Sequence, residues 1–272
     1  MQLVYFTKYW PSYTVEKLAS MAKEIGADGL DLAVRSGHAV NPQNVRAALP
    51  RAVKACADQG LTVSMATMET KPTDPADPTT ESLFAACGEA GVRCVKLGYF
   101  FYSTDQSYWA EVDRLRGVIE KLGRMAARHG VTACYHTHSG MFYGANAAAL
   151  MHLLRGQDPR AVGAYIDVGH LAINGEPLPL AVSMVRDYLR LVGIKSPAWE
   201  SKKEGDHVAW SHRIVPVQEG AVDCKLMVAE LKRVGFDGVL TFHGEYEMGG
   251  PDKLLAPLRS EIAFVRRLLK ET

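Results

Sequence analysis

The sequence predicts an α/β fold in which eight βα units close into a (β/α)8 TIM barrel. Three observations indicate this. Apolar strand-like runs alternate with longer helical patterns along the chain, eight such pairs can be counted, and 272 residues suit one barrel, which typically takes roughly 250. Neither an internal repeat nor a linker-like composition marks a boundary, so we expect residues 1–272 to form a single barrel domain.

Short apolar runs rich in β-branched residues predict the strands. Their expected ranges are 2–6, 28–33, 61–66, 93–98, 131–136, 162–167, 190–195 and 238–243. Helices are expected to start at Asn41-Pro42 and at Thr79-Thr80, because side-chain oxygens cap a first turn. Glycines follow five helical stretches, where a left-handed residue ends a helix: Gly26, Gly60, Gly91, Gly130 and Gly235.

Long loops are expected after strands two, three, five and seven, at 34–41, 67–78, 137–143 and about 196–220. In such barrels the active site lies at the C-terminal ends of the strands and is built from these loops. The stretch 196–220 is too long for a plain connection, which predicts a functional lid or loop.

Composition and charge narrow the classes of function. The 31 basic and 30 acidic residues give a net charge of +1, so no large field favours nucleic acid. No apolar run is long enough to cross a membrane and no export signal opens the chain, so we expect a cytoplasmic protein. The five cysteines form no C-x-x-C pair, as is typical of reduced thiols.

Histidines and carboxylates gather at three predicted strand ends. These residues are His136 and His138 after strand five, Asp167 and His170 after strand six, and His243 and Glu245 after strand eight. Imidazole and carboxylate ligands suit Mn²⁺, Co²⁺, Zn²⁺ or Fe²⁺ better than an all-oxygen Mg²⁺ site would. Alternatively, individual histidines cap strand ends through backbone hydrogen bonds, and Asp167 caps a helix or pairs with an arginine.

Two lysines, Lys96 and Lys195, lie within otherwise apolar strands. Burying an unpaired charge is costly, so each either pairs with a barrel carboxylate or stabilises an oxyanion. Arg35 and His38 follow strand two, and Arg213 and Glu219 follow strand seven. These residues either bind substrate or form salt bridges at the rim. Aromatic side chains near strand ends would provide flat walls for a sugar ring, or plug the core.

Several segments together resemble a known family: Gly29-Leu-Asp-Leu-Ala-Val-Arg-Ser-Gly-His38, Tyr135-His-Thr-His-Ser-Gly140, Tyr165-Ile-Asp-Val-Gly-His170, Val215-Pro-Val-Gln-Glu-Gly-Ala-Val-Asp223 and Phe236-Asp-Gly-Val-Leu-Thr-Phe-His-Gly-Glu-Tyr246. The resemblance is to the sugar phosphate isomerase/epimerase family with the xylose isomerase-like TIM barrel, and it covers nearly the whole chain. It implies a divalent metal at the barrel mouth and 1,2-proton transfer on a polyol or keto sugar. The family also commonly forms homo-oligomers.

The expected ligands of that family are a carboxylate after strand five, an aspartate after strand six, a histidine after strand seven and a glutamate after strand eight. Asp167 matches the second of these. The corresponding positions here hold His136, Gly193 and His243, with Glu245 two residues later. The usual pair of glutamates for acid/base chemistry is therefore missing from its ordinary places.

The residues and the resemblance together predict one divalent ion (Mn, Co, Zn or Fe) held by His136, Asp167, His243 and Glu245. Glu245, His138 or His170 would move a proton, and Lys195 or Lys96 would stabilise an enediolate. Expected contacts to a small sugar or polyol substrate come from Arg35, His38, Lys96, Trp199, His212, Arg213 and Glu219.

This chemistry predicts an isomerase or epimerase acting on a sugar, keto sugar or polyol. Loss of a β-substituent from the same enediolate would instead give a lyase or dehydratase acting on a keto sugar or a 3-keto glycoside. A non-catalytic sugar-binding barrel is a further alternative. A DNA-repair endonuclease shares this type of barrel, but the near-neutral charge of the chain argues against it.

Overall fold

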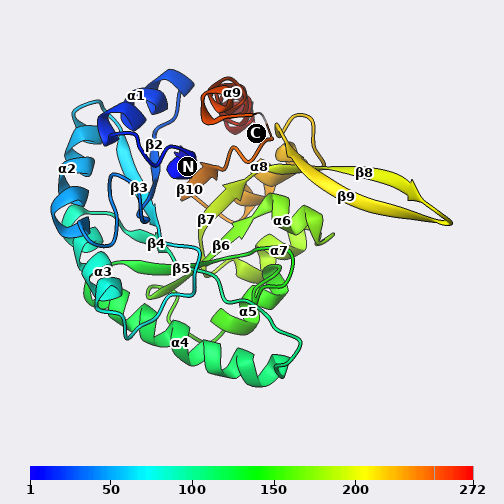
Figure 1. Cartoon of the computed structure of the whole chain (residues 1–272), viewed down its shortest axis with the longest axis horizontal. Helices are drawn as coiled ribbons and strands as arrows, with labels where there is room; N and C mark the ends of the chain where they lie inside the picture. Colours follow the sequence, from blue (N-terminus) through cyan, green and yellow to red (C-terminus); the bar gives the residue numbers. More distant parts are fainter. Residues whose placement is uncertain (248, 272) are drawn as a thin grey trace.

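The computed structural model describes residues 1–247 and 249–271, and it confirms the predicted barrel. Eight parallel strands close in the order β1-β10-β7-β6-β5-β4-β3-β2, with β1 hydrogen-bonded to both β2 and β10. Helices surround the strands (Figure 1). The barrel strands are β1 (Gln2–Phe6), β2 (Gly29–Ala33), β3 (Thr62–Thr67), β4 (Cys94–Lys96), β5 (Thr132–His136), β6 (Val162–Asp167), β7 (Leu189–Ile194) and β10 (Val239–Phe242).

The helices follow the strands in sequence. They are α1 (Val15–Ile25), α2 (Val45–Ala57), α3 (Pro78–Ala90), α4 (Tyr108–Arg128), α5 (Ala147–Leu154), α6 (Val168–Ile173), α7 (Leu178–Val185), α8 (Cys224–Arg233) and α9 (Leu255–Glu271), with 3-10 turns η1 (Thr7–Tyr9) and η2 (Pro251–Leu254). No helix among the described residues is long and apolar enough to cross a membrane. All five cysteines are free thiols.

Helix ends agree with the sequence better than helix starts do. Gly26 and Gly91 adopt the predicted left-handed conformation at the ends of α1 and α3. Both predicted starts are wrong. The side chain of Asn41 accepts hydrogen bonds from backbone amides of its own turn, so α2 begins only at Val45. Asp77 caps α3 by accepting from the Thr79 amide at 2.8 Å.

The buried apolar side chains form two clusters, and the smaller one lies inside the barrel, below its polar C-terminal mouth. Val4, Met65, Cys134, Tyr165, Leu191 and Val239 form the smaller cluster. Neighbouring residues in the same strands, such as Leu3 and Tyr5, belong to the larger cluster that packs against the helices. Because side chains alternate between the two faces of a strand, the smaller cluster fills the barrel interior. Titratable groups therefore collect above it, at the C-terminal mouth.

The stretch expected as a loop or lid is mostly a β-hairpin. β8 (Ser196–Glu204) and β9 (His207–Val215) pair antiparallel over nine residues, around a turn at Gly205 and Asp206. The hairpin projects outward from the barrel (Figure 1). The two strands of this hairpin were not predicted, because the length of the stretch was taken as the decisive signal. The alternation of apolar and polar residues in this stretch is a strand pattern.

Candidate metal centre and active site

Three predicted ligands meet at the barrel mouth, because the strands that carry them end close together. His136 ends β5, Asp167 ends β6, and His243 directly follows β10. The Oδ2 atom of Asp167 lies 3.6 Å from Nε2 of His136 and 3.2 Å from Nδ1 of His243. All three side chains are buried. Chain segments more than a hundred residues apart therefore form one compact cluster, the His136–Asp167–His243 triad.

Strand β7 passes between β6 and β10 and leaves room for this triad. Gly193 of β7 pairs with Asp167 of β6. A Cβ atom at position 193 would lie only 2.9 Å from Oδ2 of Asp167. Gly193 stands where the family resemblance implied a histidine ligand. A side chain there would crowd Asp167, so three strands contribute ligands to the triad and β7 leaves the space for them.

The chemistry of the triad fits a divalent metal ion. Nε2 of His136, Oδ2 of Asp167 and Nδ1 of His243 all lie within 4.8 Å of one another. Each is buried, and none has a hydrogen-bond partner among residues 1–247 and 249–271. Buried polar atoms are normally hydrogen-bonded, so three unsatisfied atoms that face one another require another explanation. Two imidazoles and one carboxylate form a ligand set for a borderline ion such as Zn²⁺, Mn²⁺, Co²⁺ or Fe²⁺.

Two tyrosines contact the outer ring nitrogens of the two histidines in the triad. The Tyr99 hydroxyl lies 3.0 Å from Nδ1 of His136, and the Tyr165 hydroxyl lies 2.8 Å from Nε2 of His243. If each ring N–H donates to its tyrosine oxygen, the opposite nitrogen carries a lone pair that faces Asp167. Metal-ligating histidines usually have such a partner on the second nitrogen. Sequence analysis missed this role of Tyr165, although its position two residues before Asp167 in the same strand was a usable signal.

Glu245 lies beside the triad and is held by two lysines. Its Oε2 accepts from Lys195 at 2.7 Å, and its Oε1 accepts from Lys8 at 2.5 Å. Burial alone would raise the pKa of Glu245, but Lys195, Lys8 and His243 hold it well below its usual value. Glu245 Oε1 is 3.7 Å from Nδ1 of His243, close to the triad although outside its ligand set. Lys8, in η1 after β1, was not predicted, because a lone lysine in a short turn carries no sequence signal.

Lys195 connects the triad to His170. Its Nζ lies 3.6 Å from Oδ2 of Asp167 and 2.7 Å from Nε2 of His170. Burial alone would lower the pKa of Lys195, but Asp167 and Glu245 raise it, so the ammonium stays charged and donates. His170 therefore accepts at Nε2 and carries its proton on Nδ1, which lies 2.8 Å from the Ser139 hydroxyl. Burial lowers the pKa of His170 well below its usual value, which keeps the ring neutral.

His138 uses only one ring nitrogen in a hydrogen bond within the described chain. Its Nδ1 lies 2.9 Å from the backbone oxygen of Ser139, and a carbonyl only accepts, so Nδ1 carries the proton. Nε2 then has the lone pair. Burial lowers the pKa of His138, so the imidazole is neutral. Its ring centroid lies 6.4 Å from that of His136 and 4.0 Å from that of His170.

The other side of the mouth contains Lys96 and Arg35. Nζ of Lys96 lies 3.4 Å from the centroid of the Tyr99 ring and, within the described chain, has no hydrogen-bond partner. Burial lowers the pKa of Lys96 well below its usual value. Arg35 donates from Nε to the Met68 backbone oxygen at 2.9 Å, and His38 lies at the rim with Nε2 3.3 Å from the Lys8 backbone oxygen. Their roles in binding substrate stay predictions.

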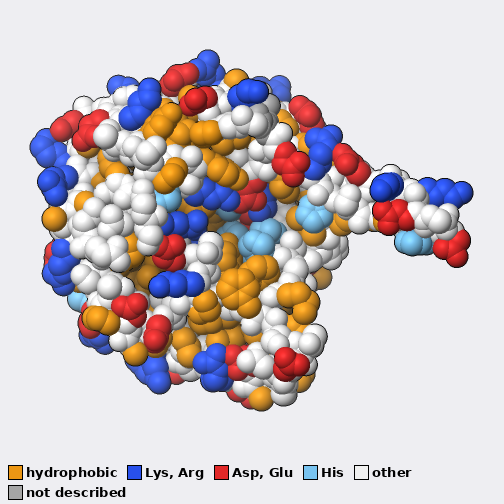
Figure 2. Space-filling view, in the orientation of Figure 1, with side chains coloured by type: hydrophobic (Ala, Val, Ile, Leu, Met, Phe, Trp, Pro, Cys, Tyr) orange, Lys and Arg blue, Asp and Glu red, His pale blue; other side chains and the backbone are white. Residues whose placement is uncertain are grey.

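Four predicted substrate contacts do not join this cluster within one chain. Trp199, His212 and Arg213 lie on the projecting hairpin, where the Trp199 and His212 rings contact each other and Arg213 pairs with Glu200. Glu219 follows the hairpin and is exposed. Figure 2 shows histidine, basic and acidic side chains in the hollow at the centre of the molecule, with the hairpin extending away from it.

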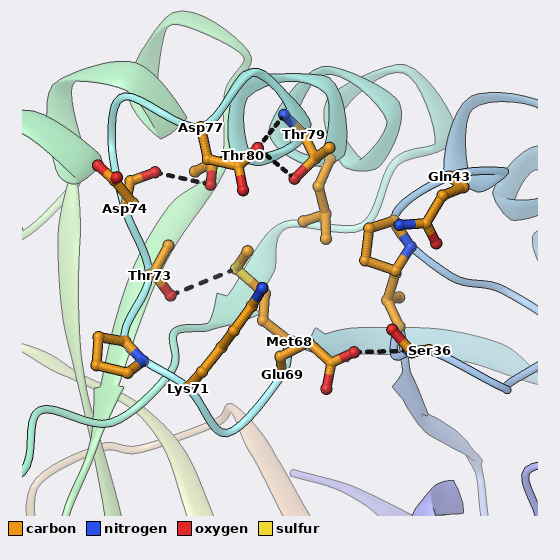
Figure 3. A pocket seen from close by; sticks show the side chains of 14 residues that line it. Ser36, Gln43, Met68, Glu69, Lys71, Thr73, Asp74, Asp77, Thr79 and Thr80 are labelled. Atoms are coloured by element: carbon orange, nitrogen blue, oxygen red, sulfur yellow. Dashed lines mark hydrogen bonds between the residues drawn. The ribbon is translucent and has the colours of Figure 1, made fainter.

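A separate pocket of about 330 Å³ lies beside the mouth. The loops after β2 and β3 and the first turn of α3 line it (Figure 3). Glu69 accepts from the Ser36 amide across its base at 2.6 Å, and Lys71 extends along one wall. None of the predicted site residues lines this pocket. The triad, Lys195 and Glu245 therefore lie at the polar mouth and not in this pocket.

Comparison with known proteins agrees with the fold. Inosose dehydratase from Lacticaseibacillus casei is 26% identical over 145 residues, which are 50% of this chain and 48% of that protein. The chain thus spans about half the length of the curated relatives it matches. The structure of D-psicose 3-epimerase from Clostridium cellulolyticum H10 is similar with a TM-score of 0.73 and 13% identity, covering 99% of each chain.

The structure of 3-keto-D-glucoside 4-epimerase from E. coli is similar with a TM-score of 0.74 and 15% identity, covering 98% of this chain and 99% of that one. At these identities the structural likeness shows the shared barrel alone. A family model described as "Xylose isomerase-like TIM barrel" matches residues 19–268. The chain therefore belongs to the xylose isomerase-like TIM barrel family.

Proposed function

We propose that the chain is a metal-dependent isomerase or epimerase that acts on a sugar, keto sugar or polyol through an enediolate. The observation that carries this proposal is the triad of His136, Asp167 and His243, whose three unsatisfied atoms face one another in a buried mouth. The similar proteins add support, because two are the epimerases named above and one is an inosose dehydratase.

A divalent ion in the triad would polarise a substrate carbonyl and its neighbouring hydroxyl, which makes the C–H bond between them more acidic. The protein's own groups then decide where the proton goes. Glu245, His138 and His170 are the alternatives for moving it, and their hydrogen bonds support His138.

His138 is the best-placed base. Its Nε2 carries the lone pair, because Nδ1 donates to the Ser139 backbone oxygen, whereas Nε2 of His170 already accepts from Lys195. Both oxygens of Glu245 accept from lysines, and a carboxylate with a lowered pKa is a weak base. We therefore assign proton abstraction to His138, and we assign to Glu245 the tasks of keeping Lys195 charged and of holding Lys8 in place.

Lys195 is the group that would stabilise negative charge on the enediolate. Its ammonium is buried, charged and fixed by three partners, so little reorganisation is needed when charge develops on the substrate. Lys96 lies under the same mouth, but its lowered pKa favours the neutral amine. It would act as a hydrogen-bond donor to a hydroxyl and not as a counter-charge.

Metal content and proton exchange together test the proposal. Protein purified without chelator should contain about one divalent ion per chain, measured by elemental mass spectrometry, and Asp167→Asn and His136→Gln should lose it. His207→Gln on the exposed hairpin is the matched control and should keep the ion. Binding of no ion by the unaltered protein, even after soaking with Mn²⁺, Co²⁺, Zn²⁺ and Fe²⁺ in turn, would reject the metal-dependent mechanism.

A panel of keto sugars and 3-keto glycosides in D₂O should then show deuterium entering the carbon next to the carbonyl. His138→Gln should slow this exchange by about 10²-fold or more while the metal stays bound. If exchange in His138→Gln equals that of the unaltered protein, another group moves the proton.

A dehydratase is the second candidate, favoured by the inosose dehydratases that match half of the chain. The same enediolate would lose a β-hydroxyl instead of regaining its proton. Mass spectrometry of the products separates the two reactions, because dehydration removes one water, whereas epimerisation leaves the mass unchanged apart from deuterium. Binding without exchange or turnover would point to a non-catalytic sugar-binding barrel.

A further inference from the structure

The hairpin formed by β8 and β9 is a separate two-stranded sheet that does not pair with the barrel strands. Its nine pairs of residues lie outside the barrel, and the outer edges of both strands are unpaired within the described chain. A two-stranded hairpin alone is only marginally stable in water. A hairpin of this length is therefore expected to have a surface to lie on.

Residues directly opposite each other in an antiparallel pair point to the same face. One face, called the apolar face below, carries the pairs Pro197/Ile214, Trp199/His212, Ser201/Trp210 and Lys203/Val208. The opposite, polar face carries Ala198/Arg213, Glu200/Ser211, Lys202/Ala209 and Glu204/His207.

On the apolar face the exposed fractions are 45% for Trp199, 52% for Val208 and 66% for Trp210. Alternation of this kind is typical of a sheet with one buried face. The hairpin has this sequence pattern, but within the described chain no other element buries its Trp199, Val208 and Trp210 side chains.

A second exposed apolar surface lies at the barrel mouth. Phe101, after β4, is 53% exposed, and Met141, after β5, is 55% exposed. The Phe101 ring packs on Phe142 at a centroid distance of 5.0 Å, and Phe142 lies 4.2 Å from the ring of His138. Phe101, Met141 and Phe142 form the rim patch, which borders the proposed active site.

We infer that the hairpin is a dimerisation arm whose apolar face packs on the rim patch of a second copy of the chain, while that copy's arm packs on the rim patch of the first. Such a contact uses the same two surfaces on both subunits, as a twofold axis requires.

Charge favours another copy over a polyanion or an anionic membrane. Residues 196–215 contain three basic side chains and three acidic ones, and the whole chain carries a net charge of only +1. Two copies therefore meet without repulsion, and no excess of positive charge favours a phosphate-rich surface.

The hairpin is placed to reach a neighbouring copy. It extends away from the barrel, and charged side chains lie along the side of it that Figure 2 shows.

The expected area also favours an arm on a body over an arm on an arm. One face of a nine-residue, two-stranded ribbon covers about 30 by 10 Å. Two arms packed only on each other would bury roughly 600 Å², which is below a stable interface, whereas two reciprocal contacts of arm on body would bury about 1,200 Å².

Sedimentation equilibrium across a dilution series tests the inference on the full chain. The unaltered protein should behave as a dimer, and Trp199→Ser combined with Trp210→Ser should raise the dimer dissociation constant by roughly thirtyfold or more. Glu200→Ser combined with Lys202→Ser is the matched control, because it alters the polar face of the same strand and keeps the net charge. The control should remain as dimeric as the unaltered protein.

A second variant examines the other half of the contact. Phe101→Ser combined with Met141→Ser should weaken the dimer by a similar factor if the arm packs on the rim patch. A dimer unaffected by this change would overturn the assignment of the arm to the mouth. A monomeric unaltered protein, or equal dimer strength in the tryptophan variant and the control, would overturn the inference altogether. Thermal unfolding of each variant at high dilution verifies that the barrel is intact.

Discussion

Replacing Tyr165 by phenylalanine isolates the hydrogen bond that orients one proposed metal ligand. The phenylalanine keeps the ring, which is buried in the barrel interior, and removes only the hydroxyl that lies 2.8 Å from Nε2 of His243. Burial raises the pKa of Tyr165 well above its ordinary value, so the hydroxyl stays neutral, and its oxygen accepts the ring proton when His243 carries that proton on Nε2. Without it, His243 loses the partner that directs its lone pair on Nδ1 toward Asp167.

The expected loss follows from this geometry. Removing an outer partner of a metal ligand typically lowers metal affinity by about 10- to 100-fold, which is about 1.4 to 2.7 kcal/mol. The histidine N–H would also be left buried without an acceptor, at a cost of about 1–3 kcal/mol to the metal-free fold. Tyr99→Phe should behave in the same way through His136, because its hydroxyl lies 3.0 Å from Nδ1 of that ring.

Competition with a chromophoric chelator for Zn²⁺ or Mn²⁺ measures the metal affinity. Urea unfolding of the metal-free protein measures the stability lost when the buried histidine N–H has no acceptor. Tyr143→Phe is the matched control, because this tyrosine is buried and its hydroxyl has no hydrogen-bond partner in the described part of the chain. Its affinity should stay at that of the unaltered protein. Equal metal affinity in Tyr165→Phe and Tyr143→Phe would refute the orienting role.

Three further changes concern stability. Lys195→Met should lower the free energy of unfolding by about 3–5 kcal/mol, because buried Asp167 and partly buried Glu245 lose their shared cation, while Lys202→Met on the exposed hairpin should stay within about 0.5 kcal/mol. Burial raises the pKa of Glu261 from 4.5 to about 7, so the folded chain holds a proton that the unfolded chain releases between these values. Stability from this group is complete below pH 4.5 and falls by about 3 kcal/mol as the pH rises to 7, a dependence that Glu261→Gln should abolish. Gly117→Ala in α4 should stabilise by about 0.5–1 kcal/mol, since its added Cβ meets nothing within 4 Å, whereas Gly88→Ala in α3 should destabilise by about 1–3 kcal/mol, since its Cβ would lie 2.1 Å from the His129 backbone oxygen.

Each of these has a clear contrary outcome in denaturant unfolding. Equal losses in the two lysine variants would mean that the cation in the mouth is not needed to balance its carboxylates. A pH profile unchanged by Glu261→Gln would assign the dependence to other groups. A stabilising Gly88→Ala would show that the contact between α3 and the end of α4 relaxes easily.

Much of the fold could be read from the sequence because its signals are local. Strands buried on both faces appear as short apolar runs, and glycines with a left-handed conformation end helices, so all eight barrel strands and the ends of α1 and α3 follow from neighbouring residues. The same locality places His136 and Asp167 at strand ends, and barrel architecture puts such ends at one mouth. Candidate ligands were therefore predictable.

The choice among the candidates depended on the closed barrel. Histidines at 207 and 212 lie in the same kind of sequence context as His243, yet they belong to a hairpin that leaves the barrel. The hydroxyls of Tyr99 and Tyr165, and the ammonium of Lys8, meet their partners across 37, 78 and 237 residues. A sequence pattern reports spacing along the chain, whereas hydrogen bonds, ion pairs and shared desolvation depend on distance in space, which only closure between β1 and β10 establishes.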